Sequence, residues 1–148
     1  MSALPKIAPI DEAYYAELGG RDAIERVHNV FYDILLSHPW LKGFFEGKVK
    51  ERLVSQQTDF MTAMLGGPKR YYGRDPGPAH CHLFITDEVF DLRHQLLGEA
   101  MERAGLAPHL RAPWLKRDWA MRRALVKSQP SECFGRYKME PIIVVPKP

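Results

Sequence analysis

The residues best suited to chemistry are adjacent in the stretch His80-Cys81-His82, directly before an apolar run. Imidazole nitrogens and cysteine thiolates are both common metal ligands in proteins. His80 and His82 are two positions apart, so on a helix their side chains would point about 200° apart. No regular helix therefore lets both histidines reach one metal ion, and one of them, or neither, is a ligand.

Two other kinds of site need more partners than the sequence offers. A structural zinc site takes about four ligands, yet Cys133, His94 and His109 show no paired spacing such as Cys-x-x-Cys. A Ser or Cys hydrolase of the nucleophile-elbow type places its nucleophile between a strand and a helix, and no serine or cysteine here has that context. Taken alone, each histidine is more often a surface or packed residue than a ligand.

A second set of polar residues lies within apolar stripes. Gln57 lies on a predicted helix face that is otherwise apolar, formed by Leu53, Phe60, Met61 and Met64. A buried amide without a partner costs about 1–3 kcal/mol, and the hydroxyl of Tyr32 could meet it across a helix pair. Two hydrogen-bonding groups in an apolar lining are typical of a small-ligand pocket. The same two side chains also fit an ordinary core pair.

The elements that position these residues are predicted to be helices. Apolar residues at helical spacing indicate one helix within residues 22–39 and a second within residues 51–65. Asp22 is predicted to cap the first helix, and Gly66-Gly67-Pro68 to end the second.

Later elements follow from caps and helix breakers. Thr86 is predicted to cap a helix that ends at Gly105, and a last helix is expected over 112–127, with Pro113 in its first turn. Segment 69–78 has Gly or Pro at four of its ten positions, which predicts a loop.

The chain has 148 residues, a length that suits one compact domain. We expect this domain to span residues 1–128 and an extended tail to span residues 129–148, where a β-branched run is bounded by prolines. The sequence offers no partner strand for that run, so the predicted fold class is all-α.

Charge and hydropathy limit the partners. The formal net charge is +3, with Lys and Arg scattered, so we expect no nucleic-acid partner, although an anionic small ligand is compatible. No apolar run approaches the ~20 residues of a membrane span, and the first residues lack a secretory signal. We therefore expect a cytoplasmic protein without a membrane partner. Cys81 and Cys133 could in principle pair, but in the cytoplasm they should stay reduced.

Read together, these residues resemble a known family, the truncated haemoglobins, without gaps from about residue 14 to residue 106. The resemblance is carried by LGG at 18–20, VFYDILLSHPWLKGFFEG at 30–47, QQTDFMTAMLGGP at 56–68, the loop from Tyr71 to Gly73, and AHCHLFITDEVF at 79–90. The Tyr-Gln pair and the Gly-Gly motifs are most similar to the first group of that family.

The resemblance implies a two-on-two helical sandwich around haem b, with His80 as the proximal iron ligand. It places Tyr32 at the distal tyrosine, Gln57 at the distal glutamine, Leu53 at the distal gate and Phe45 against the porphyrin. His82 is expected to face away or to lie near a propionate. The cofactor-binding residues expected are Phe31, Phe45, Leu53, Phe60, Met61, Tyr71, Arg74, Ile85 and Phe90, with Lys69 and Arg70 as further cations for the propionates.

Two features depart from the family pattern. Arg93 stands where an apolar residue or tryptophan usually lines the haem, and a guanidinium cannot stay buried without a partner. We therefore expect Arg93 to reach a propionate or the bound ligand, where it would join Tyr32 and Gln57 as a catalytic residue. The tail beyond Pro130 is longer than the usual end, and it is expected either to cover the haem edge or to dock a partner.

The function implied is binding of diatomic ligands, O2, NO or CO, with possible dioxygenation of NO that needs a separate reductase. Two alternatives stay open. One is a peroxidase-like enzyme in which Arg93 polarises a peroxide and assists O–O cleavage. The other is a six-coordinate haem sensor or electron carrier, in which His28 or another internal base replaces the external ligand.

Overall fold

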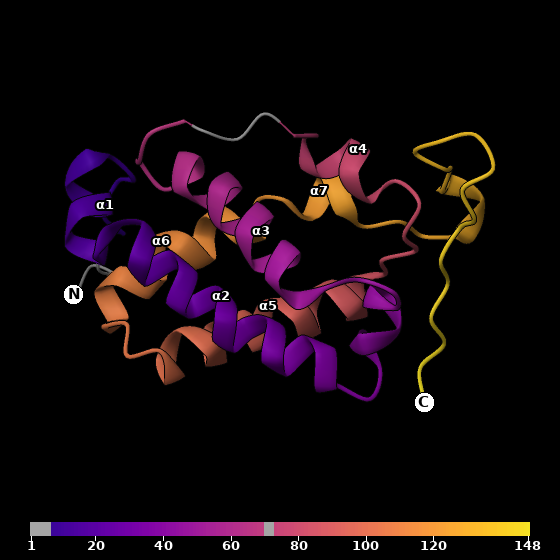
Figure 1. Cartoon of the computed structure of the whole chain (residues 1–148), viewed down its shortest axis with the longest axis horizontal. Coiled ribbons are helices and arrows are strands. Elements are labelled where there is room, and N and C mark those ends of the chain that lie inside the picture. The colour runs from indigo at the N-terminus through magenta and orange to yellow at the C-terminus, as the bar shows by residue number, and fades with distance from the viewer. Residues whose placement is uncertain (1–6, 70–72) are drawn as a thin grey trace, which may run out of the picture.

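The computed structural model describes residues 7–69 and 73–148 of the chain, and within these ranges it consists of helices joined by loops, with an extended tail at the C-terminus (Figure 1). The elements, in chain order, are α1 (Glu12–Leu18), α2 (Gly20–Ser37), the 3-10 helix η1 (Leu41–Phe45), α3 (Lys50–Met64), α4 (Pro76–His80), α5 (Asp87–Arg103), α6 (Pro108–Trp119), α7 (Arg122–Leu125) and the 3-10 turn η2 (Pro130–Glu132). The predicted all-α class is confirmed.

Helix α2 is the centre of the sandwich, because it packs against α3 on one side and α5 on the other, while α5 also packs against α6. Its apolar stripe makes both contacts possible: Ile24, Val27, Phe31 and Leu35 recur at helical spacing and are each at most 2% exposed. The helix pair α2–α3 thus lies on the pair α5–α6, which is the expected two-on-two arrangement.

The helix boundaries follow local chemistry. Gly19 has φ 107°, a left-handed conformation that suits glycine, and it joins α1 directly to α2. The predicted cap Asp22 is therefore wrong, since α2 begins at Gly20 and Asp22 lies in its first turn. The predicted cap Thr86 is confirmed, because its Oγ1 accepts a hydrogen bond from the backbone N–H of Val89 at 3.2 Å.

Two other expectations are corrected. The last predicted helix is divided into α6 and α7, and α6 begins at Pro108, so that Pro113 lies inside the helix and not in its first turn. Proline suits the first helical position because it has no N–H to donate. Pro76 likewise begins α4 within the segment 69–78 that was expected to be loop.

Beyond α7 the chain is largely extended, as expected of the tail, apart from η2 and a turn at residues 136–140. Two isolated parallel bridges, Leu83 with Ile143 and Ile85 with Val126, tie it and the end of α7 to the segment before α5. The boundary between a domain at 1–128 and a tail at 129–148 stays a prediction.

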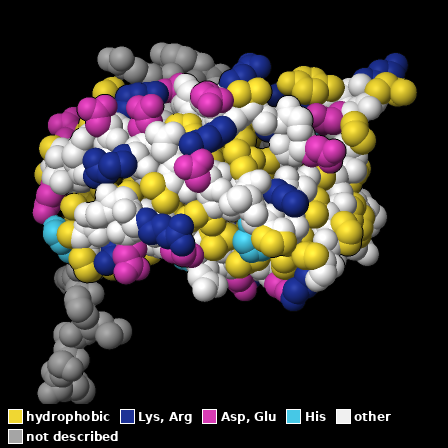
Figure 2. All heavy atoms as spheres, turned by 60° about the horizontal axis from the view of Figure 1, so that its bottom comes forward, with side chains coloured by type: hydrophobic (Ala, Val, Ile, Leu, Met, Phe, Trp, Pro, Cys, Tyr) yellow, Lys and Arg dark blue, Asp and Glu magenta, His cyan; other side chains and the backbone are white. Residues whose placement is uncertain are grey.

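Basic and acidic side chains are interspersed on the face that Figure 2 shows. Within the described ranges, no helix combines the length and apolar character that crossing a membrane requires.

A buried ionic cluster joins α5 to α6. The carboxylate of Asp118, a residue only 1% exposed, accepts a hydrogen bond from Arg93 Nη1 at 2.9 Å, and His94 Nδ1 lies 2.7 Å from the same oxygen. Burial by itself raises the pKa of this carboxyl, but the charges and hydrogen bonds of Arg93 and His94 outweigh burial and lower the pKa to about 2. Asp118 is therefore ionised, and it neutralises a guanidinium inside the fold.

We predict that Asp118→Asn lowers the free energy of unfolding by about 3 kcal/mol or more, because Arg93 then keeps a buried charge without a counter-ion. Urea unfolding of the variant and the wild type measures the difference. Glu99→Gln is the matched control: it breaks the exposed pair of Glu99 with Arg103 on the same helix α5 and should cost less than about 0.5 kcal/mol. Equal losses in the two variants would contradict the prediction.

Candidate functional site

A cavity of about 250 Å³ lies between α2, α3, η1 and the segment from α4 to α5, and it is also bordered by α7 and the tail. Most residues that the sequence analysis selected contribute to its wall: Phe31, Tyr32, Phe45, Leu53, Gln57, Phe60, Arg74, His80, Ile85, Phe90 and Arg93. The structure therefore brings together segments from five helices and their connections around one space, with apolar side chains in the majority.

Met61 is a correction, because it does not contribute to the cavity wall. Gln57 and Phe60 lie on the cavity face of α3, whereas Met61 is 1% exposed and shares the neighbouring face with Val54 and Thr58, both buried in the core. One position along a helix turns a side chain by about 100°. This turn is enough to move Met61 from the cavity face to the buried face of α3.

Two further expectations concern His28 and Tyr71. His28 is absent from the wall of this cavity. Its Nδ1 lies 2.9 Å from the hydroxyl of Thr58, and its ring meets Trp114 edge-on at 5.6 Å. Burial lowers the pKa of His28 to about 3, so it is a neutral core residue, and the expectation that it serves as an internal sixth ligand is not supported. Tyr71 lies outside the described residues.

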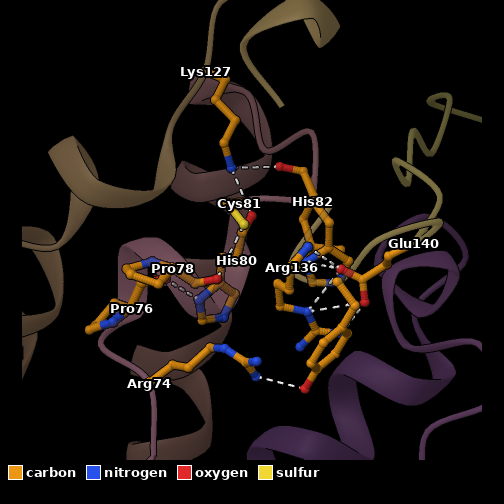
Figure 3. Close-up of polar contacts among 11 residues, drawn as sticks. Arg74, Pro76, Pro78, His80, Cys81, His82, Lys127, Arg136 and Glu140 are labelled. Atoms are coloured by element: carbon orange, nitrogen blue, oxygen red, sulfur yellow. Dashed lines mark hydrogen bonds and ion pairs between the residues drawn. The ribbon is translucent and has the colours of Figure 1, made fainter. Parts of the chain in front are cut away.

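His80 is the last residue of α4, and its ring is fixed by the backbone (Figure 3). Its Nδ1 lies 2.7 Å from the carbonyl oxygen of Pro76, so Nδ1 carries the proton and donates it, which leaves the lone pair on Nε2. Burial lowers the pKa of His80 to about 4. The side chain is thus a neutral imidazole, held in the tautomer that a metal ligand requires.

The turn after His80 is also fixed by a half-buried cation. Lys127 Nζ donates hydrogen bonds to the carbonyl oxygens of His80 and Leu83, at 2.8 and 2.7 Å. His82 lies in the same turn, is 4% exposed and contributes to the cavity wall. Its Nδ1 is buried without a hydrogen-bond partner. His82 therefore faces the cavity, and the alternative in which it faces away is excluded.

Tyr32 and Gln57 supply hydrogen-bonding groups from α2 and α3. Tyr32 is 8% exposed, and burial raises the pKa of its hydroxyl to about 12, so the phenol keeps its proton. Within the part of the chain that the structure describes, no hydrogen bond joins Tyr32 to Gln57. Because both line the cavity, the two side chains can direct their polar groups to a small molecule inside it.

Arg93 reaches the cavity from α5 while it is paired with Asp118. Its guanidinium carbon lies 5.5 Å from the ring centre of Phe31 and 5.8 Å from that of Phe90. Asp118 was not predicted from the sequence, although a signal existed: it is the single acidic residue between Glu102 and Glu132, and a buried arginine needs a carboxylate partner.

Cations other than the predicted Arg74 also contribute to the wall. Lys48 follows η1, and Arg136 comes from the tail, whereas Lys69 is exposed and is not among the lining residues. The apolar wall includes residues that the sequence analysis did not assign to the site, among them Leu35, Leu41, Phe44, Leu83, Val89, Met121 and Leu125. No local pattern separates these residues from ordinary core.

Comparison with known proteins gives consistent matches. The family model described as "Bacterial-like globin" matches residues 13–126. A group 1 truncated hemoglobin of Mycolicibacterium paratuberculosis is 37% identical over 92 residues, which cover 62% of this chain and 68% of that protein.

Solved structures agree with the sequence comparisons. The crystal structure of truncated hemoglobin from Tetrahymena pyriformis, in its Fe(III) form, has a TM-score of 0.70 at 27% identity and covers 78% of this chain and 98% of that chain. The 2/2 hemoglobin of Synechococcus sp. PCC 7002, solved in the cyanomet state with covalently attached heme, has a TM-score of 0.66 at 25% identity. The match covers 72% of this chain and 89% of that chain. With its two-on-two helices and its cavity, the chain belongs to the first group of the truncated haemoglobins, within the bacterial-like globin family.

Proposed function

We propose that the chain binds haem b through His80 and uses the iron to bind diatomic ligands such as O2, NO and CO. One observation supports this proposal above the others. A neutral imidazole with its lone pair on Nε2 and two hydrogen-bonding side chains, Tyr32 and Gln57, line the same apolar cavity. Haem proteins commonly use one proximal histidine and leave the sixth position of the iron open.

The residues present fit this cofactor. Haem is a flat apolar plate with two carboxylates, and it needs aromatic and aliphatic walls with cations at one edge. Phe31, Phe45, Phe60 and Phe90 contribute aromatic surface to the cavity, and cationic side chains of Lys48, Arg74 and Arg136 line it as well. The unpartnered Nδ1 of His82 points to a further polar group that belongs in the same space, because a buried nitrogen without a partner is costly.

The polar side chains determine which ligands are held longest. A protonated Tyr32 hydroxyl and the Gln57 amide donate hydrogen bonds to a ligand that carries partial negative charge. Dioxygen gains more from these donors than carbon monoxide does, so the cavity favours O2 retention. In the finer version of this proposal, NO and O2 combine with one electron from a separate reductase to give nitrate.

We predict that His80→Ala loses the Soret band of the holoprotein and binds haemin more than a hundredfold more weakly, since even the loss of an outer-shell partner costs about 10–100-fold. Haemin titration followed by absorption measures the effect. His109→Ala is the control, because His109 is exposed and pairs with Glu17 at the surface. An unchanged spectrum in His80→Ala would refute the proposed ligand.

We predict that Tyr32→Phe and Gln57→Leu each speed O2 dissociation about tenfold, the effect of losing a hydrogen bond worth about 1.4 kcal/mol. CO dissociation should change far less. Flash photolysis and stopped-flow mixing give both rates. Tyr14→Phe is the matched control, because it also removes a phenol hydroxyl, but one whose hydrogen bond goes to the backbone of α6, at the Leu110 carbonyl oxygen 2.6 Å away. Similar effects on O2 and CO would speak against a donor role.

The position of Arg93 favours a peroxidase-like activity as a second candidate. Its guanidinium lines the cavity and is held in place by Asp118. A fixed cation stabilises negative charge that develops on oxygen as an O–O bond breaks. The six-coordinate sensor or electron carrier has weaker support, because His28 is engaged in the core, and absorption spectra of the ferric and ferrous protein would identify it.

We predict that Arg93→Leu lowers peroxide-dependent oxidation of a reducing dye by about a hundredfold, the typical cost of removing one charge-stabilising donor. Arg93→Lys, which keeps the charge beside Asp118, should retain part of the activity and serves as the check on folding. Arg103→Leu, at the exposed end of α5, should leave turnover unchanged. Full activity in Arg93→Leu would exclude this second function.

A further inference from the structure

We infer that the C-terminal tail belongs to the cofactor site: residues 133–145 strap the segment that carries His80 and bring Arg136 to the cavity as a binding group for a carboxylate of the cofactor. The inference rests on the proposed haem binding. It goes beyond the family pattern, because the family match ends at residue 126 and Arg136 lies after it.

The tail is hydrogen-bonded to the backbone of the segment 81–84. The N–H of Phe134 donates to the carbonyl oxygen of Cys81 at 3.0 Å, and the N–H of Ile143 donates to that of His82 at 2.8 Å. In return, the N–H of Phe84 donates to the Ile143 carbonyl oxygen at 2.9 Å. These three bonds join two points of the tail to the turn that follows His80.

The end of the tail packs against η1, which also contributes to the cavity wall. Trp40 Nε1–H donates to the carbonyl oxygen of Val145 at 3.0 Å. Gly43 leaves room for the tail, because a Cβ at that position would lie 2.6 Å from a methyl carbon of Val145. In Figure 1 the tail runs beside the end of the sandwich where η1 and the start of α3 lie. It therefore spans from the His80 turn to η1.

Between these anchors, a tight turn presents Arg136 to the cavity. The Arg136 guanidinium makes hydrogen bonds from Nε and Nη2 to the Glu140 carboxylate at 2.8–3.2 Å, and the Arg136 backbone N–H donates to the same carboxylate at 2.6 Å (Figure 3). The side chains are only 19% and 14% exposed. Gly135 permits the turn, since a Cβ there would lie 2.8 Å from the Glu140 carbonyl oxygen. Glu140 thus holds the guanidinium in one place in the cavity wall.

The same turn also positions a second cation of the wall. Arg74 Nη1 donates to the Tyr137 hydroxyl at 2.9 Å, and its guanidinium carbon lies 4.6 Å from the Tyr137 ring centre. Arg74 precedes α4, so the tail connects a cation near the start of that helix with Arg136. A bound carboxylate would meet two guanidinium groups that the tail has already placed.

The side chain of His82 is independent support for a polar ligand group beside Arg136. His82 is 4% exposed, its Nδ1 has no hydrogen-bond partner, and the nearest carboxylate oxygen, on Glu140, is 4.0 Å away. That oxygen is beyond hydrogen-bond distance and is already bonded to Arg136. A carboxylate entering the cavity would lie among Arg136, Arg74 and His82, all of which contribute to its wall.

The test is the rate at which full-length holoprotein loses haemin to an excess of apomyoglobin, for the wild type, Arg136→Gln and Arg136→Lys. Each protein is loaded either with haemin or with haemin dimethyl ester, whose carboxylates are neutralised. We expect Arg136→Gln to release haemin about tenfold faster than the wild type, the equivalent of about 1.4 kcal/mol, and Arg136→Lys to restore part of the difference. With the dimethyl ester, the variant and the wild type should release the cofactor at the same rate.

Arg103→Gln is the matched control, because Arg103 also pairs with a glutamate four residues away but lies on the exposed end of α5; it should release haemin at the wild-type rate. Equal acceleration of haemin and ester loss in Arg136→Gln would overturn the inference, since Arg136 would then act only through the fold of the tail. Equal haemin loss in variant and wild type would overturn it as well. Failure of the proposed function is distinguishable, because the wild type would then bind no haemin at all.

Discussion

The hydrogen bond between His80 Nδ1 and the Pro76 carbonyl oxygen, 2.7 Å long, determines what the cavity can do. It assigns the proton to one ring nitrogen and leaves the other as a lone-pair donor. The bond exists because Pro76 begins a five-residue helix whose last residue is His80, so that the ring reaches the carbonyl one turn before it. Lys127 then fixes the following turn through the carbonyl oxygens of His80 and Leu83.

The parts of the fold that could be predicted are those in which a short sequence pattern is sufficient. The stripe on α2 and the cap at Thr86 are local, and the cavity face of α3 follows from the spacing of Leu53, Gln57 and Phe60. A pattern of this kind shows which face of a helix is apolar, but not where the part of that face that lines a cavity ends and the part that packs in the core begins. Met61 was assigned to the cavity for this reason. Such a pattern also does not show whether Pro108 or Pro113 begins the helix. The predicted start of α6 was therefore four residues too late, at 112 instead of 108.

The rest of the site depends on contacts between residues far apart in the chain. Asp118 neutralises Arg93 across two helices, and a favourable ion pair inside the protein requires geometry that no spacing rule supplies. A buried pair of this kind is not strong evidence for stability, because desolvation opposes the attraction between the charges. The pair instead fixes a position: it keeps the guanidinium in the cavity wall, close to the rings of Phe31 and Phe90.

Arg136 in the tail is positioned in the same way, by a carboxylate partner that lies within the fold. A long cationic side chain that is free in solution loses rotamer entropy when it binds a ligand, at a cost of about 0.5–1.5 kcal/mol. Glu140 orders Arg136 before any ligand arrives, and its ion pair with the guanidinium lowers the pKa of the Glu140 carboxyl to about 2, so that this carboxylate stays ionised. A bound carboxylate would then join an arginine whose position the fold has already set, whereas the exposed Lys48 would have to be ordered on binding. In this proposal, preorganisation is what lets an extended tail contribute a binding group to the site.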